Sequence, residues 1–148
     1  MEDNNEKSLH FIENYDIINA RERKIKSDRY PVTQQQIDDI LENELKEYIF
    51  PVKPVYNSRI RANGITRGTI YKWGQFKRII SIEIGKQDNS DRKFLIDTLL
   101  HEYFEADIMI KQNTDSFYKK LSESGDIVRH KWINSQIDKF FEKLEGSK

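Results

Sequence analysis

The sequence predicts an α+β fold in which a small antiparallel sheet packs against a central apolar helix and flanking helices. Apolar residues recur at helical spacing before residue 50 and again after residue 92. Between these regions, glycines separate short runs that are rich in β-branched and aromatic residues. A chain of 148 residues is long enough for one core and short for two. We therefore expect residues 51–148 to form the α+β core and residues 1–50 to form a helical segment, either part of the same domain or an extension.

Two helices are predicted before residue 51. The first falls within the first 30 residues, and Pro31 ends it. The second begins with the capping-box pattern Thr33–Gln36, continues through apolar side chains at helical spacing and stops before Pro51. These side chains are Ile37, Ile40, Leu41, Leu45, Tyr48 and Ile49. Residues 51–58 contain two prolines and are expected to form an extended connector.

The sheet is predicted from the glycine-punctuated middle of the chain. Residues 69–73 and 76–84 have the composition of strands, and Gly74-Gln75 supplies the turn between them. Residues 59–62 and 65–67 are two further short strand candidates. Alternation along the second strand places Ile80, Ile82 and Ile84 on one face of the sheet.

Three helices are predicted after the sheet. Residues 88–91 carry the capping residues of a long helix that extends to about Gln112, and a short helix follows at 115–121. The last helix begins near Asp126 and ends near Leu144. Its apolar stripe faces the core and consists of His130, Ile133, Ile137, Phe140 and Leu144.

The long helix combines an apolar composition with ionisable residues at its centre. His101, Glu102, Glu105 and Asp107 lie within a largely apolar stretch from Phe94 to Met109. A buried carboxylate costs several kcal/mol unless another group compensates its charge, and a metal ion is a strong compensator. His101 and Glu105 are four residues apart and therefore share one helical face.

This spacing predicts a zinc site with His101, Glu105 and His130 as its ligands. Catalytic zinc uses three imidazole or carboxylate ligands and keeps one open position. His130 is the best third ligand because it faces inward from another helix. Glu102 would be the general base and Asp107 would orient a ligand from outside the ligand set. For each histidine taken alone, a hydrogen-bonded core residue is the simpler interpretation.

Leu99-Leu-His-Glu-Tyr-Phe-Glu-Ala-Asp-Ile-Met109 resembles the active-site helix of zincin-like metallopeptidases. The usual motif is His-Glu-x-x-His. The helix is similar to variants with a final Glu, which occur in small zincin-like domains of bacterial polymorphic toxins and phage-associated proteins. The resemblance covers residues 60–140 and implies zinc at His101, Glu105 and His130, Glu102 as the catalytic base, and a polypeptide substrate. Glu105 in place of the second His adds a negative charge at the metal and raises the pKa of its water.

A basic segment suggests a different function. Residues 51–80 contain seven Lys and Arg residues and no Asp or Glu, and aromatic residues lie among them. This pattern is typical of single-stranded nucleic-acid surfaces. A metal-independent ribonuclease of toxin type would use His101 and His130 as acid and base. Its RNA contacts would come from Arg59, Arg61, Arg67 and Lys77.

A non-enzymatic interaction module is the third class that the sequence allows. The expected partners of the hydrolase are a polypeptide substrate or target protein and a cognate inhibitor or immunity protein; RNA is expected only for the ribonuclease. The chain has no cysteine, and no apolar run approaches the ~20 residues of a membrane span. The acidic start of the chain does not resemble a signal peptide, so we expect a cytoplasmic site of action.

Overall fold

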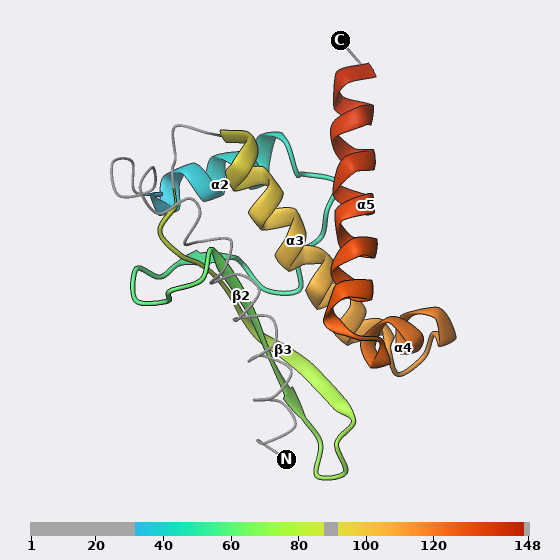
Figure 1. Ribbon diagram of the computed structural model, residues 1–148. Helices are drawn as coiled ribbons and strands as arrows, with labels where there is room; N and C mark the ends of the chain where they lie inside the picture. The colour runs from blue at the N-terminus through green and yellow to red at the C-terminus, as the bar shows by residue number, and fades with distance from the viewer. Residues whose placement is uncertain (1–31, 88–91, 147–148) are drawn as a thin grey trace.

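The structure is a computed structural model that describes residues 32–87 and 92–146, and within these residues it confirms the predicted α+β class. A long hairpin and a long helix, α5, lie on opposite sides of the helix α3, which contacts both (Figure 1). In chain order the elements are α2 (Gln34–Asn43), β1 (Val55–Tyr56), β2 (Gly64–Ile70), β3 (Phe76–Ile84), α3 (Arg92–Lys111), α4 (Ser116–Glu123) and α5 (Asp126–Gly146).

The sheet is mixed, whereas an antiparallel sheet was expected. Its strand order is β1-β3-β2, with β2 and β3 antiparallel and β1 parallel to β3. The short strand β1 comes from the segment 51–58 that was predicted to be a connector. The side chain of Gln34 holds this segment in place, because it donates to the carbonyl of Pro54 at 3.1 Å and accepts from the backbone N–H of Tyr56 at 2.7 Å.

A β-bulge changes the face on which one isoleucine lies. The pairing shifts from Arg67↔Ser81 to Gly68↔Ile79, so Ile80 has no partner residue on β2. A bulge interrupts the alternation of faces along a strand. Ile79 is therefore buried and Ile80 is 47% exposed, which corrects the prediction that Ile80 shares a face with the buried Ile82.

The capping box of α2 is confirmed, but the helix ends earlier than predicted. Thr33 accepts from the backbone N–H of Gln36, and the side chain of Gln36 accepts from the backbone N–H of Thr33. The helix ends at Asn43 because the chain turns there and buries Leu45, whose N–H donates to the carbonyl of Ile40 at 3.0 Å.

The helices after the sheet lie close to their predicted bounds. Asp115 caps α4 by accepting from two backbone N–H groups. On α5, the predicted inner residues are buried from His130 to Phe140, while Leu144 is 37% exposed. No helix within residues 32–87 and 92–146 combines the length and the apolar character needed to cross a bilayer. The helix predicted in the first 30 residues and the cap at 88–91 lie outside the described residues.

Gly85, just after β3, lies where a side chain would collide with backbone. A Cβ atom there would approach the carbonyl oxygen of Ala62 to 2.2 Å. We expect Gly85→Ala to lower the free energy of unfolding by about 1–3 kcal/mol, the usual cost of overpacking. Urea denaturation measures this change. Gly146→Ala is the control, since a Cβ atom there meets nothing within 4 Å; equal midpoints for the two variants would contradict the expectation.

Candidate metal centre

The middle of α3 buries three ionisable side chains. His101 is 7% exposed, Glu102 1% and Glu105 2%. The helix takes this position because its apolar residues contact the hairpin on one side and α5 on the other. Its ionisable groups are therefore enclosed between secondary-structure elements and do not reach the surface. Such burial requires compensation of each charge or loss of the charge.

His130, in the first turns of α5, completes a group with His101 and Glu105. The two imidazole rings are stacked, with centroids 5.0 Å apart and an interplanar angle of 10°. His130 Nε2 lies 4.0 Å from Glu105 Oε2. One ligand atom from each of the three residues lies within 4.8 Å of the others. The structure thus brings together the three residues that the sequence predicted as ligands.

This buried group could hold a metal ion. Two ligands of a tetrahedral zinc ion, each at about 2.1 Å from it, lie about 3.4 Å apart. The separations here are somewhat wider, so small side-chain rotations would close the group around an ion. Glu105 Oε2 is buried and makes no hydrogen bond within residues 32–87 and 92–146, which fits an atom that serves as a metal ligand.

The pKa values favour uncharged side chains in the protein without metal. The pKa of His101 is lowered to about 3, mainly by burial and to a smaller extent by the neighbouring His130 and Arg129. Burial also lowers the pKa of His130, while Asp126 opposes the shift. Burial raises the pKa of Glu105 to about 7, although Arg129 lowers it. Both histidines are therefore neutral near pH 7, which is the form that binds metal ions.

Glu102 lies against the hairpin. Thr66 of β2 donates a hydrogen bond to Glu102 Oε1 at 2.9 Å. A Cβ atom on Gly64 would lie 2.9–3.1 Å from the side chain of Glu102, so glycine leaves the space that this side chain occupies. Burial raises the pKa of Glu102 well above its ordinary value, and the charge of Glu105 raises it further. The sequence analysis did not identify Gly64 or Thr66, because their role depends on packing between a strand and a distant helix.

Two residues of α5 contact the candidate ligands. Arg129 Nε donates to Glu105 Oε1 at 3.0 Å, and the same guanidinium pairs with Asp126. The carbonyl oxygen of Asp126 lies 2.9 Å from His130 Nδ1. Asp107, which was expected to orient a ligand, instead pairs with Lys111 Nζ at 3.2 Å on its own helix. Arg129 directly precedes His130 in the sequence. This adjacency was the signal that could have identified Arg129 as a residue near the candidate ligands.

The basic segment is not gathered around the two histidines. Arg67 Nε donates to Glu83 Oε2 at 2.7 Å. Neighbouring residues of a strand point to opposite faces. Arg67 therefore points away from α3, toward which Thr66 points. Lys77, whose Nζ lies 5.7 Å from the ring centroid of Tyr71, is near the hairpin turn, and Arg59 and Arg61 are exposed in the connection before β2.

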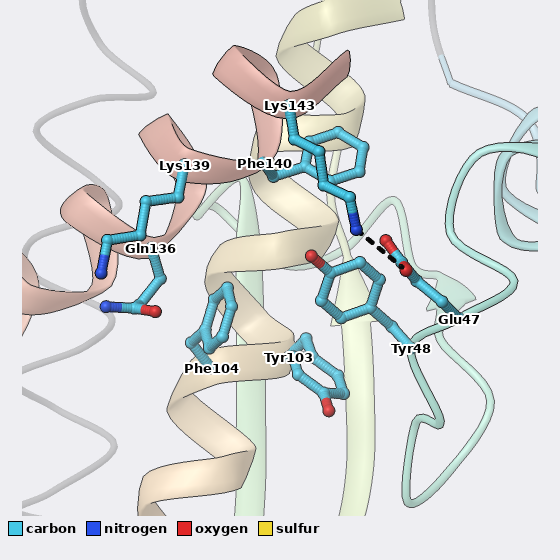
Figure 2. A pocket seen from close by; sticks show the side chains of 8 residues that line it. All are labelled: Glu47, Tyr48, Tyr103, Phe104, Gln136, Lys139, Phe140 and Lys143. Atoms are coloured by element: carbon cyan, nitrogen blue, oxygen red, sulfur yellow. Dashed lines mark ion pairs between the residues drawn. The ribbon is translucent and has the colours of Figure 1, made fainter. Parts of the chain in front are cut away.

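A separate pocket lies where α3, α5 and the connection after α2 meet. It has a volume of about 340 Å³, and Figure 2 shows that aromatic rings from all three parts face it. Tyr48 packs edge-on against Tyr103, Phe104 and Phe140, with centroid separations of 5.1–6.3 Å. None of the three candidate ligands lines this pocket. Its aromatic walls help to hold α3 against α5, the two helices that carry the candidate ligands.

Comparison of the chain with protein-family models, curated proteins and solved structures gives no match. The functional argument therefore rests on the geometry and chemistry of the group formed by His101, Glu105 and His130.

Proposed function

We propose that the protein is a zinc-dependent hydrolase of zincin-like type that acts on a polypeptide. The observation that carries the proposal is the convergence of His101, Glu105 and His130 in a buried group beside Glu102. Two imidazoles and one carboxylate are a ligand set typical of catalytic zinc. The toxin-type role, with a target protein and a cognate inhibitor, belongs to the same proposal and follows from the resemblance of the motif helix.

Each residue has a distinct role in this proposal. His101, Glu105 and His130 would hold the ion, which would supply a Lewis acid and a bound water molecule with a pKa far below that of bulk water. Glu102 would accept and return a proton. Thr66 would orient the Glu102 carboxylate, because its hydroxyl already donates to Oε1. A nearby divalent cation would favour the ionised form of Glu102, which burial disfavours in the protein without metal.

An extended peptide could bind the sheet by pairing with the edge of a strand, and residues 79–84 of β3 lie in the strand that follows the turn of the hairpin. In the structure β3 is the central strand, with β2 on one side and β1 paired at Glu83 and Ile84 on the other. A peptide could therefore pair with β3 only where β1 does not. The strand β2 lies at an edge of the three described strands and is the alternative strand for pairing.

We expect the purified protein to bind about one zinc ion per chain, with His101→Ala or Glu105→Ala abolishing binding. Three protein ligands hold a catalytic zinc ion, so the loss of one removes much of the binding free energy. Elemental analysis after dialysis measures the metal content. Glu102→Gln should keep the metal, since the proposal places this residue outside the ligand set.

Asp107→Asn is the matched control, because it removes a carboxylate from the same helix. This carboxylate pairs with Lys111. The variant should keep a full complement of zinc. A metal-free wild-type protein after exposure to excess zinc would remove the proposal. Equal zinc content in the wild type and in His101→Ala would remove this assignment of ligands.

A structural zinc site is the second candidate function, and the depth of burial favours it. Structural sites are closed, whereas catalytic sites keep an open position. His101, Glu105 and His130, and Glu102 beside them, are each at most 7% exposed. Titration of the cobalt-substituted protein with acetohydroxamate separates the two functions. A change in the visible spectrum would indicate an open position and support catalysis, and an unchanged spectrum would support the structural role.

A further inference from the structure

The first turn of α5 gives the two oxygens of Glu105 different environments. The side chain of Arg129 is 13% exposed, and its Nε donates to Glu105 Oε1 at 3.0 Å. Asp126 pairs with Nη2 of the same guanidinium and helps to hold it in place. Glu105 Oε2 faces His130 Nε2 at 4.0 Å. Only one oxygen of this carboxylate is therefore directed at the candidate metal position.

The charge of Arg129 also matters. Two neutral imidazoles and one carboxylate carry a net charge of −1, and the guanidinium beside Glu105 offsets it. A histidine at position 105 would need no such partner, whereas a buried glutamate does. This chain has Glu105 where the usual His-Glu-x-x-His pattern has its second His. Arg129 compensates the negative charge that this glutamate adds.

We propose that Arg129 is a positioning residue that makes Glu105 a one-oxygen ligand and thereby selects zinc-like cations. The inference rests on the proposed metal site. Calcium takes six to eight oxygen ligands and magnesium requires six in octahedral geometry. Two imidazole nitrogens and a single carboxylate oxygen suit zinc or cobalt instead. If Arg129 is removed, both oxygens of Glu105 become available, and the site becomes looser and richer in oxygen.

A purely structural role is the alternative. Arg129 ties α5 to α3 through Glu105, so its loss could change stability without changing the metal. Metal affinity and the spectrum of bound cobalt distinguish the two roles. Metal affinity and the cobalt spectrum report on the ligands themselves. Loss of an ion pair that only connects α5 to α3 would change the unfolding of the protein and leave both unchanged.

The test compares wild type, Arg129→Gln, Arg129→Lys and the control Lys131→Gln, which removes one positive charge from an exposed neighbour of His130. Zinc affinity is measured by competition with a chelator, and cobalt binding by visible absorption. We expect Arg129→Gln to weaken zinc binding about 10- to 100-fold, the usual effect of losing a residue that orients a ligand. Its absorption per bound cobalt should also decrease, because a two-oxygen Glu105 raises the coordination number. Arg129→Lys should recover part of the affinity, and Lys131→Gln should match wild type.

Unchanged zinc affinity and an unchanged cobalt spectrum in Arg129→Gln would overturn the inference while leaving the metal site intact. Tighter zinc binding would also overturn it, because the guanidinium would then only repel the cation. A wild-type protein that binds neither zinc nor cobalt would remove the proposed function and this inference together. If Arg129→Gln does not fold, Asp126→Asn provides the same two measurements, since it removes the charge that anchors Arg129.

Discussion

Zinc is expected to raise the Tm of the metal-free protein strongly at pH 8 and much less at pH 5. A ligand at 100 to 1,000 times its Kd stabilises the folded state by about 2.7–4.1 kcal/mol. For a domain of about 150 residues, each kcal/mol shifts Tm by roughly 2–4 °C, so the expected increase is roughly 5–16 °C. Differential scanning calorimetry with and without zinc measures it. His130→Ala, which lacks a ligand, should show no increase.

The pH dependence follows from the pKa of Glu105, which burial raises to about 7. At pH 8 this carboxyl is mostly ionised and ready to bind zinc. At pH 5 zinc must displace a proton from it, which costs on the order of 3 kcal/mol over the two units below pH 7. His101 does not contribute, because its pKa of about 3 keeps it neutral across this range.

The raised pKa of Glu105 also makes the stability of the metal-free protein depend on pH. The folded state keeps a proton on Glu105 that the unfolded chain releases above an ordinary pKa of 4.5. The resulting stabilisation is complete below pH 4.5 and is lost as the pH rises to about 7, by an amount on the order of 3 kcal/mol. Glu105→Gln has no proton to lose, so wild type should lose stability relative to this variant between pH 4.5 and 7. If the free energies of unfolding of wild type and Glu105→Gln differed by a constant amount across this pH range, the raised pKa of Glu105 would be contradicted.

Ile133→Ala is expected to lower the free energy of unfolding by about 2–5 kcal/mol, which is a large part of the stability of a small domain. Ile133 is fully buried and lies one turn after His130 on α5. The cavity would loosen the packing that holds His130 against α3, so zinc affinity should fall as well. Urea denaturation of the metal-free protein and a chelator competition measure the two effects.

Ile127→Ala is the matched control for this prediction. It makes the same chemical change on the same helix, but Ile127 is 85% exposed. We expect its effect to lie within about 0.5 kcal/mol, as for most surface substitutions. If both variants unfolded at the same urea concentration, α5 would not be packed through Ile133.

The sequence was sufficient to predict elements whose signals are local. The capping box at Thr33 and the i, i+3 spacing of His130 and Ile133 depend only on neighbouring residues, and the structure confirms the helices they predict. The strand β1 and the bulge at Ile80 could not be predicted in this way. β1 exists because Gln34 binds it from a distant helix, and the bulge depends on the register between two strands.

The candidate site was predictable for a similar reason. His101 and Glu105 lie one turn apart on a helix that the apolar pattern identifies, and the stripe on α5 directs His130 inward. The residues around them were harder to find. Gly64 and Thr66 approach Glu102 from 36–38 positions earlier in the chain, and no sequence spacing indicates such a contact. Asp107 was expected to orient a ligand, and the sequence analysis did not anticipate its ion pair with Lys111.

The positions of the three candidate ligands have a mechanical consequence for a chain without cysteine. His101 and Glu105 belong to α3 and His130 belongs to α5, with α4 in the loop between them. An ion bound by all three would act as a cross-link that closes this loop, as a disulfide would. Cross-links stabilise a protein mainly by restricting the unfolded chain. Unlike a disulfide, this cross-link would open with a chelator or with acid.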